Sequence, residues 1–169
     1  MPDNRIRPAR IEPMEQPRGK AKLALVAGGA AAGLIAIVAG FEGKSNDPYL
    51  DIVGVPTVCY GETRVEMRRY TDAECEDMLA DGLSDFAEGV LERSPELKGH
   101  DAQLLAATSL AYNIGLRAYG RSTVEKRFER GDWRGACDAI LLWNRAGGRV
   151  VKGLDIRRRK ERAICLRGL

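Results

Sequence analysis

The repeating pattern of apolar and polar residues predicts helices over most of the chain after residue 70. Thr71 and Glu74 have the spacing of a capping box, which starts a helix by satisfying its first free amides. Apolar side chains then recur every three to four residues, as on the buried face of a helix, at Met78, Leu79, Leu83, Phe86 and Val90. Residues 101–114 are apolar on nearly every side, so we expect a helix inside a core that ends at Gly115.

Further helix starts follow the same logic, at Ser94-Pro95, Ser122-Thr123, Asp132 and Asp155. The last of these helices is basic, and its apolar positions are Ile156, Ala163, Ile164 and Leu166. Gly147-Gly148 predicts a turn before it. The β-like residues lie at 49–60, where Gly54 and Pro56 limit the length of a strand. The pattern therefore predicts a mostly helical α+β domain with one small hairpin or sheet.

Residues 23–41 form a segment of nineteen residues without a charge. That is about the length of helix that spans a bilayer. Seven alanines and four glycines make the segment weakly hydrophobic, and Gly29 and Gly33 have a spacing that lets membrane helices approach closely. Basic residues precede the segment, so we expect residues 1–22 to stay in the cytoplasm as a flexible tail while the rest crosses.

Four interpretations of this segment compete. A secretory signal peptide would be cleaved near Val38–Gly40, although the tail before it is long. The high content of Gly and Ala argues against a permanent anchor. A helix buried in a soluble domain usually has a charged face, which this segment lacks. A signal-anchor helix that can later leave the bilayer fits the weak hydrophobicity best, and residues 42–169 would then be the folded domain.

The net charge of +3 lies in the first 22 residues, where six basic residues face three acidic ones. Residues 41–101 carry 15 acidic and 6 basic residues, and residues 102–169 carry 6 acidic and 15 basic ones. Two lobes that face each other across a cleft would have this distribution, with the basic lobe suited to an anionic polymer. Two solvated helical surfaces would give the same counts.

The cysteines of the chain favour disulfides over a metal site. Cys59, Cys75, Cys137 and Cys165 show no C-x-x-C spacing, and His100 is the single histidine, so we expect no metal and no cofactor. Four cysteines would suit two disulfides in an oxidising compartment. Three pairings are open, and the sequence does not choose between them.

Glu42, Asp51 and Thr57 could together carry out acid–base chemistry. Glycoside hydrolysis needs a carboxylic acid that protonates the leaving group and a second carboxylate on the other side of the sugar. Glu42 follows the apolar segment, where partial loss of water would favour its protonated form. Asp51 has polar neighbours and could stay ionised, and the hydroxyl of Thr57 could help it to hold a water. Acidic residues are common in this chain, so composition alone gives this interpretation little support.

The same residues resemble the signature of the phage-type muramidases, glycoside hydrolase family 24. Eight residues separate Glu42 from Asp51 and five separate Asp51 from Thr57, as in that signature. The matching landmarks, in chain order, are Glu42-Gly43, Tyr49-x-Asp51, Thr57-x-x-x-Gly61, Tyr112-Asn113-x-Gly115, Gly131-Asp132-Trp133 and Gly153-Leu154-x-x-Arg157-Arg158-x-x-Glu161. The resemblance covers about 41–169, which is the whole of the expected domain.

The resemblance implies a lysozyme-like, two-lobed fold that cleaves the β-1,4 bond between N-acetylmuramic acid and N-acetylglucosamine in peptidoglycan, with inversion of configuration. Glu42 would be the general acid, Asp51 would orient or activate water, and Thr57 would complete the water site. Tyr49 and Asn113 would contact the sugars. Arg157 and Arg158 would pair with Glu42 or face the glycan. Taken singly, each arginine is more typical of a solvated basic helix face.

The apolar segment before Glu42 is similar to that of the signal-anchor-release endolysins of phages of Gram-negative bacteria. Such an enzyme is exported by the host secretion machinery, held inactive at the inner membrane and freed into the periplasm. The resemblance implies peptidoglycan glycan strands and the inner membrane as partners, no nucleic acid, and a monomer after release. Glu42 would lie at the level of the lipid headgroups while anchored, which would keep it from meeting Asp51 across a glycan.

Two residues depart from the family pattern, in which Thr-x-Gly-x-Gly-His often follows the aspartate. Cys59 stands in place of a glycine, and Glu62 in place of a histidine that is usually structural. Cys59 lies close to the proposed catalytic residues, so its redox state could affect activity. A non-enzymatic glycan-binding protein would not need Glu42, Asp51 and Thr57 together, and a lytic transglycosylase could manage with one acid and no residue that holds water.

Overall fold

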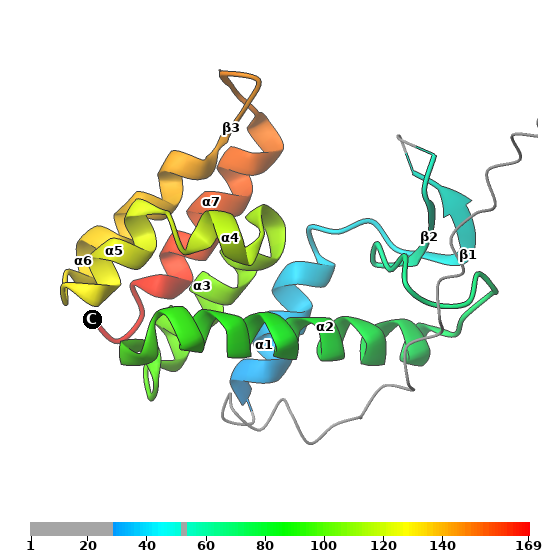
Figure 1. The fold of residues 1–169 in the computed structure, drawn as a ribbon, viewed down its shortest axis with the longest axis horizontal. Helices are drawn as coiled ribbons and strands as arrows, with labels where there is room; N and C mark the ends of the chain where they lie inside the picture. The colour runs from blue at the N-terminus through cyan, green and yellow to red at the C-terminus, as the bar shows by residue number, and fades with distance from the viewer. Residues whose placement is uncertain (1–28, 52–53) are drawn as a thin grey trace, which may run out of the picture.

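The long helix α2 (Asp72–Arg93) joins two lobes of different size in the computed structural model, which describes residues 29–51 and 54–169 (Figure 1). The predicted capping box is confirmed, because the Thr71 side chain accepts from the Glu74 amide and the Glu74 carboxylate accepts from the Thr71 amide. Leu79, Leu83 and Val90 are buried, as the periodicity predicted. The helix therefore gives both lobes one rigid support.

The smaller lobe is built on a two-stranded antiparallel sheet of β1 (Ser45–Leu50) and β2 (Pro56–Cys59). Tyr49 lies opposite Thr57, and Leu50 lies opposite Pro56. The predicted hairpin is confirmed, although its first strand begins four residues earlier than the β-like run at 49–60. A strand pair this short is marginal by itself, so the lobe depends on its connections to α2.

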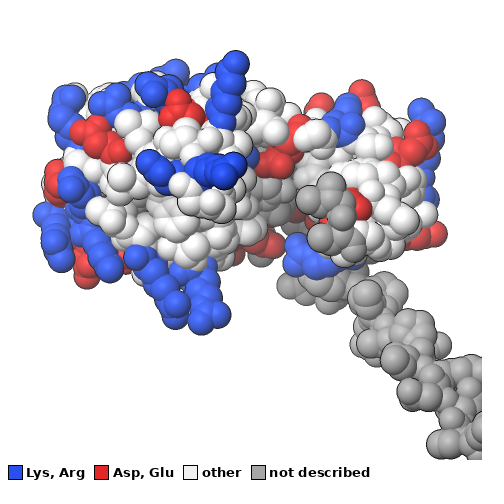
Figure 2. Space-filling model, turned by 90° about the horizontal axis from the view of Figure 1, so that it is seen from above, with Lys and Arg blue, Asp and Glu red and all other residues white. Residues whose placement is uncertain are grey.

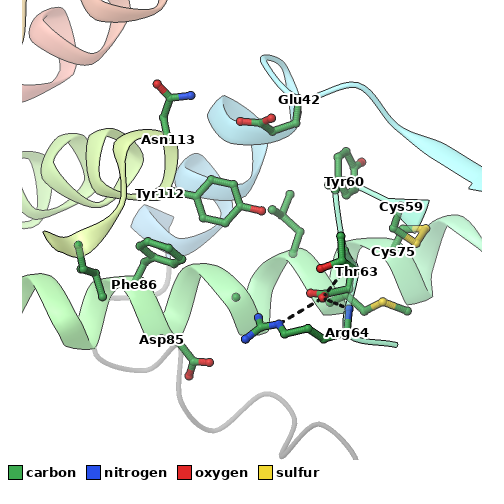
Figure 3. Close-up of a pocket in the computed structure, with 16 residues that line it drawn as sticks. Glu42, Cys59, Tyr60, Thr63, Arg64, Cys75, Asp85, Phe86, Tyr112 and Asn113 are labelled. Atoms are coloured by element: carbon green, nitrogen blue, oxygen red, sulfur yellow. Dashed lines mark hydrogen bonds and ion pairs between the residues drawn. A yellow bond between two sulfur atoms is a disulfide. The ribbon is translucent and has the colours of Figure 1, made fainter. Parts of the chain in front are cut away.

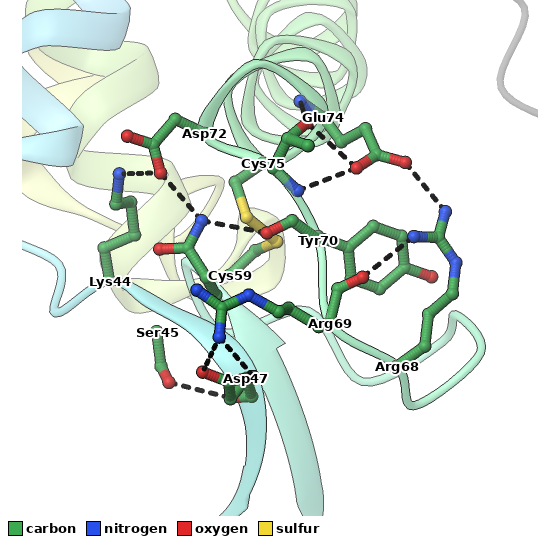
Figure 4. The surroundings of a disulfide bond; sticks show 12 residues. Lys44, Ser45, Asp47, Cys59, Arg68, Arg69, Tyr70, Asp72, Glu74 and Cys75 are labelled. Carbon is green, nitrogen blue, oxygen red and sulfur yellow. Dashed lines mark hydrogen bonds and ion pairs between the residues drawn. A yellow bond between two sulfur atoms is a disulfide. The ribbon is translucent and has the colours of Figure 1, made fainter.

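A disulfide and several polar contacts make those connections (Figure 4). Cys59 is bonded to Cys75 on α2, which settles one pairing that the sequence left open. Beside it the amide of Asn46 donates to the Asp72 carboxylate at 2.7 Å, and Lys44 pairs with the same carboxylate at 2.8 Å. Closing a loop of 16 residues stabilises a fold by about 3 kcal/mol in the chain-entropy model. The strands are thereby fixed against the start of α2.

The larger lobe surrounds α3 (Asp101–Ile114), which is buried over most of its length as predicted and ends at Gly115. The elements around it are η2 (Pro95–Leu97), α4 (Leu116–Tyr119), α5 (Thr123–Glu129), α6 (Trp133–Ala139), η3 (Ile140–Trp143), β3 (Arg145–Ala146), β4 (Arg149–Val150) and α7 (Lys152–Cys165). The Cys137–Cys165 disulfide joins α6 to α7. Figure 2 shows Lys and Arg side chains gathered on this lobe, as the counts for residues 102–169 predicted.

Helix α1 (Gly29–Ala39) packs in the core of the larger lobe, against α2 and α3 (Figure 1). Leu34 and Val38 are 1% and 0% exposed. The first residues of the predicted 23–41 span, and the tail at 1–22, lie outside the described residues. Among the helices in the described part of the chain, none has the length and apolar character needed to span a bilayer.

Two expectations for the helices need correction. Ser94-Pro95 starts a single turn of 3-10 helix, because the chain turns after Leu97 and a new helix begins at Asp101. The terminal helix α7 begins at Lys152 rather than Asp155, and Ile156, expected on its apolar face, is exposed. The predicted turn at Gly147-Gly148 is confirmed, and it joins β3 to β4, which are two residues each.

Candidate active site

A cavity of about 450 Å³ lies where the two lobes meet (Figure 3). Its walls come from the chain after α1, the end of β2 with the segment that follows it, one face of α2, the end of α3 and the start of α4. The lining residues are Glu42, Cys59, Tyr60, Gly61, Glu62, Thr63, Arg64, Cys75, Met78, Leu79, Gly82, Asp85, Phe86, Tyr112, Asn113 and Leu116. The cavity therefore contains two of the predicted catalytic and sugar-binding residues, Glu42 and Asn113, together with the cysteines Cys59 and Cys75.

The end of α1 fixes the position of Glu42. The amides of Phe41 and Glu42 both donate to the carbonyl of Val38, at 2.9 and 3.0 Å. Val38 is fully buried, so the turn that carries Glu42 is attached to the core of the larger lobe. The Glu42 side chain is 28% exposed, and its carboxylate accepts a hydrogen bond from Nη1 of Arg157 at 2.8 Å.

Arg157 belongs to a buried ionic network between α7 and α3. Its Nε donates to Oε1 of Glu161 at 3.1 Å, and Nη1 of Arg158 donates to Oε2 of the same carboxylate at 2.5 Å. The hydroxyl of Ser109 also donates to Glu161, at 2.7 Å. Arg158 then donates through Nη2 to the side-chain oxygen of Asn113. The Glu161 carboxylate thus pairs with both arginines. Each arginine is in turn hydrogen-bonded to one residue of the cavity wall, Arg157 to Glu42 and Arg158 to Asn113.

This network corrects the interpretation of the terminal helix as a solvated basic face. Arg157 and Arg158 are 4% and 0% exposed, and Glu161 is 0% exposed. Burial lowers the pKa of Arg158, and the neighbouring Glu161 carboxylate opposes that shift. The spacing of three and four residues between the arginines and Glu161 places all three on one side of a helix. That spacing was the signal in the sequence for the pairing of Arg157 and Arg158 with Glu161.

Asp51 and Thr57 lie on the hairpin, outside the residues that line the cavity. The Asp51 carboxylate accepts from the amide of Val55 at 2.8 Å, across the loop that joins the strands. The Thr57 side chain is buried, and its hydroxyl donates to the carbonyl of Val55 at 2.9 Å. Tyr49, opposite Thr57, is 42% exposed. Asp51 and Thr57 are therefore both hydrogen-bonded to the backbone of Val55, Asp51 to its amide and Thr57 to its carbonyl.

The backbone at Cys59 gives a physical reason for the glycine that the family pattern has at this position. Cys59 has a φ of 58°, in the left-handed region that residues with a side chain rarely adopt. The disulfide to Cys75 holds it there. Glu62, the second departure, turns its carboxylate back onto its own loop and accepts from the amides of Thr63 and Arg64, both at 2.9 Å. Both departures thus serve the turn that follows β2.

Tyr112 is a cavity residue to which the sequence assigned no role of its own. Burial raises the pKa of its phenol, and the carboxylates of Glu42 and Glu62 raise it further against smaller opposing effects of Arg157 and Arg64. The phenol therefore stays protonated at neutral pH, as a hydrogen-bond donor on the wall of the cavity. Its place in the Tyr112-Asn113-x-Gly115 landmark was the available signal.

Proteins of similar sequence and fold are lysozymes and endolysins of phages. A family model described as phage lysozyme matches residues 39–161. The SAR-endolysin of Enterobacteria phage P21 is 39% identical over 160 residues, which cover 88% of this chain and 95% of the relative. The structure of a P22 lysozyme mutant is similar with a TM-score of 0.71 and 28% identity, over 80% of this chain and 96% of the other. The endolysin of Escherichia coli O157:H7 phage FAHEc1 gives a TM-score of 0.67 and 28% identity, over 80% and 92%.

Proposed function

Because the chain belongs to the phage lysozyme family, we propose that Glu42, Asp51 and Thr57 are the catalytic residues with which it cleaves peptidoglycan. The protein is an endolysin with muramidase activity, a glycoside hydrolase that acts on the β-1,4 bond between N-acetylmuramic acid and N-acetylglucosamine. The observation that carries the assignment is the place of Glu42, on the wall of the cavity between the lobes and held by a buried arginine.

Glu42 is suited to protonate the oxygen of the leaving sugar. Arg157 pairs with the Glu42 carboxylate and also with Glu161, so it fixes the orientation of the Glu42 side chain. A glycan in the cavity would cover the exposed part of Glu42 and remove water from it. Loss of water favours the neutral acid, which gives its proton to the glycosidic oxygen as the bond to the anomeric carbon breaks.

Asp51 and Thr57 are suited to hold the water that attacks the anomeric carbon. The Thr57 hydroxyl donates its proton to the carbonyl of Val55, so toward a water it acts only as a hydrogen-bond acceptor. A water that donates one proton to Thr57 and the other to Asp51 points a lone pair away from both. As its oxygen bonds to the anomeric carbon, the proton that it donates to Asp51 passes to that carboxylate. Asp51 later gives a proton to solvent, and Glu42 takes one from solvent.

Replacing Asp51 by Asn is expected to lower kcat by about 10² or more, because an amide cannot take the proton of the water. Thr57→Val should also lower kcat, since the methyl group cannot accept from water, whereas Thr57→Ser keeps the hydroxyl and most of the rate. The initial rate on purified peptidoglycan measures all three, with unfolding midpoints to confirm that the variants are folded. Equal rates for Thr57→Val and Thr57→Ser would contradict the role of the hydroxyl.

We further propose that Tyr49 and Asn113 contact the sugars. Tyr49 is exposed beside Thr57 on the hairpin, and Asn113 lines the cavity opposite the hairpin lobe. The two side chains would reach different sugars of one strand.

The packing of α1 supports release from the membrane rather than cleavage of a signal peptide. In the active fold, Leu34 and Val38 belong to the core, and each side chain of this size contributes about 1.5–3 kcal/mol on burial. Cleavage near Gly40 would remove both. While residues 23–41 span the bilayer, Val38 cannot occupy the core, and the turn that holds Glu42 against Arg157 does not form. The names of the relatives, SAR-endolysins, agree with this life history.

The endolysin would therefore be exported by host secretion machinery with its N-terminus in the cytoplasm, wait inactive at the inner membrane, and act in the periplasm after release. We expect the soluble periplasmic enzyme to have the mass of the full chain, because α1 is needed in the core. Mass spectrometry of the periplasmic and membrane fractions, each assayed for lysis, measures this. A soluble species that lacks residues 1–40, or full activity in the membrane fraction, would contradict it.

A further inference from the structure

Phe41, the residue before Glu42, places its ring against two cations of α7. The Cζ atom of Arg157 lies 5.0 Å from the centre of the ring, and the Nζ atom of Lys160 lies 5.1 Å from it. An aromatic ring attracts a cation within about 6 Å of its centre, because the face of the ring carries partial negative charge. Arg157 and Lys160 are three residues apart, so they lie on one side of the helix and reach the same ring.

The backbone of Phe41 belongs to the turn that ends α1. Its amide donates to the carbonyl of Val38 at 2.9 Å, and the Glu42 amide donates to the same carbonyl at 3.0 Å. Val38 is buried in the core of the larger lobe. Phe41 is therefore held by α1 through its backbone and by α7 through its side chain. Glu42 follows it directly, so the contact with α7 also restrains Glu42.

The guanidinium of Arg157 contacts the ring while it keeps all its hydrogen bonds. Nη1 donates to Glu42, Nε donates to Glu161, and Nη2 donates to the carbonyl of Ser109 at 3.3 Å. These acceptors belong to the chain after α1, to α7 and to α3, and together they fix the place of the guanidinium. The ring attracts the positive charge as a whole, so its attraction adds to these bonds and does not compete with them.

The orientation of Glu42 depends on the turn that carries Phe41. Figure 3 shows Glu42 on this turn, at the edge of the cavity. The bond from Nη1 of Arg157 to Oε1 of Glu42 fixes one distance, 2.8 Å, but the carboxylate can still rotate about it. A general acid has to lie within hydrogen-bond distance of the oxygen that it protonates, and a displacement of about 1 Å can lower a rate by about 10²-fold. A ring held by two cations limits such a displacement.

We infer that Phe41 is a positioning residue for the general acid, because its ring, held by Arg157 and Lys160, fixes the turn from which Glu42 reaches the cavity. Phe41 is not among the residues that line the cavity, so it acts on the reaction through Glu42 and not by touching the glycan. Lys160, an exposed base, takes part through the same ring. The inference rests on the proposed function, since it takes Glu42 to be the general acid.

The test separates kcat from KM in full-length variants. Phe41→Leu keeps an apolar side chain but removes the ring, whereas Phe41→Tyr keeps the ring. Lys160→Met keeps the stem of the lysine without its charge. Initial rates at increasing concentrations of soluble, uncross-linked peptidoglycan strands give kcat and KM for each protein, and thermal unfolding gives its midpoint.

Two control variants match these changes. Phe128→Leu removes a buried ring from the same lobe, away from the cavity, where it packs on Trp133 with centroids 5.6 Å apart. Lys152→Met removes an exposed charge from the same helix as Lys160. We expect Phe128→Leu to lower the unfolding midpoint and to leave the kcat of the folded protein unchanged, and Lys152→Met to change neither.

Phe41→Leu is expected to lower kcat about tenfold, because both cation–π contacts are lost. Its KM should change by less than about twofold, since a defect confined to the chemical step leaves substrate binding intact. Phe41→Tyr should keep most of the rate. Lys160→Met should lower kcat by about two- to threefold, since Arg157 still holds the ring.

A wild-type kcat for Phe41→Leu would overturn the inference. Equal losses in Phe41→Leu and Phe41→Tyr would also overturn it, since the ring would then not be the cause. A raised KM with an unchanged kcat would do the same, because it would place Phe41 in contact with the glycan. Failure of the proposed function would show differently, as a wild-type kcat for Glu42→Gln.

Discussion

Replacing Glu161 by Gln is expected to lower the free energy of unfolding by about 3–5 kcal/mol, the cost of leaving a buried charge without its partner. Glu161 is fully buried and accepts from Arg157, Arg158 and Ser109. A glutamine of the same shape keeps one acceptor but turns donors toward one of the arginines and removes the charge that neutralises both. Domains of this size have a total stability of about 5–15 kcal/mol, so the loss is a large part of the whole.

Urea denaturation of full-length wild type and Glu161→Gln measures the difference in the free energy of unfolding. The comparison requires that this free energy falls with urea concentration at the same slope for both proteins. The matched control on the same helix is Asp155→Asn, which removes an ion pair with Arg159 at 2.7 Å. Arg159 is exposed, so we expect the control to change stability far less. If the Glu161→Gln protein is as stable as the control, the ion pairs of Glu161 with Arg157 and Arg158 do not stabilise the larger lobe.

Most helices could be predicted from the sequence because the signals for them are local. The capping box at Thr71, the apolar run at 101–114 and the glycine after it act within a few residues of each other, and the structure confirms them. The fold class followed from the same signals together with the short hairpin. The family landmarks then placed Glu42 and Asn113, which the structure brings to one cavity.

The parts that could not be predicted depend on residues far apart in the chain. The spacing within α7 could indicate that Arg157 and Arg158 pair with Glu161, but not that this network lies buried against α3, where Ser109 contacts Glu161 and Arg157, or that Arg157 reaches Glu42, 115 residues earlier. The pairing of Cys59 with Cys75 likewise requires the hairpin to fold against the start of α2. Tyr112 lacked an assigned role because its use depends on what surrounds its hydroxyl, and spacing carries no information about that.

Replacing Glu42 by Gln is expected to lower the lytic rate by several orders of magnitude, since a general acid alone contributes roughly 10²–10⁴-fold. Glutamine has nearly the shape of glutamate and its oxygen can still accept from Arg157, so the turn after α1 and the cavity should remain folded. It has no proton to give to the glycosidic oxygen and no charge to stabilise the developing cation. The expected defect is therefore in the chemical step.

The most direct test is the loss of turbidity of chloroform-treated Gram-negative cells with wild type, Glu42→Gln and Glu62→Gln side by side. Glu62 also lines the cavity, and a glutamine there can still accept from the amides of Thr63 and Arg64. The assignment of Glu42 as the general acid predicts rapid lysis by wild type, lysis by Glu62→Gln close to it, and almost none by Glu42→Gln. Lysis by Glu42→Gln at the wild-type rate would contradict it.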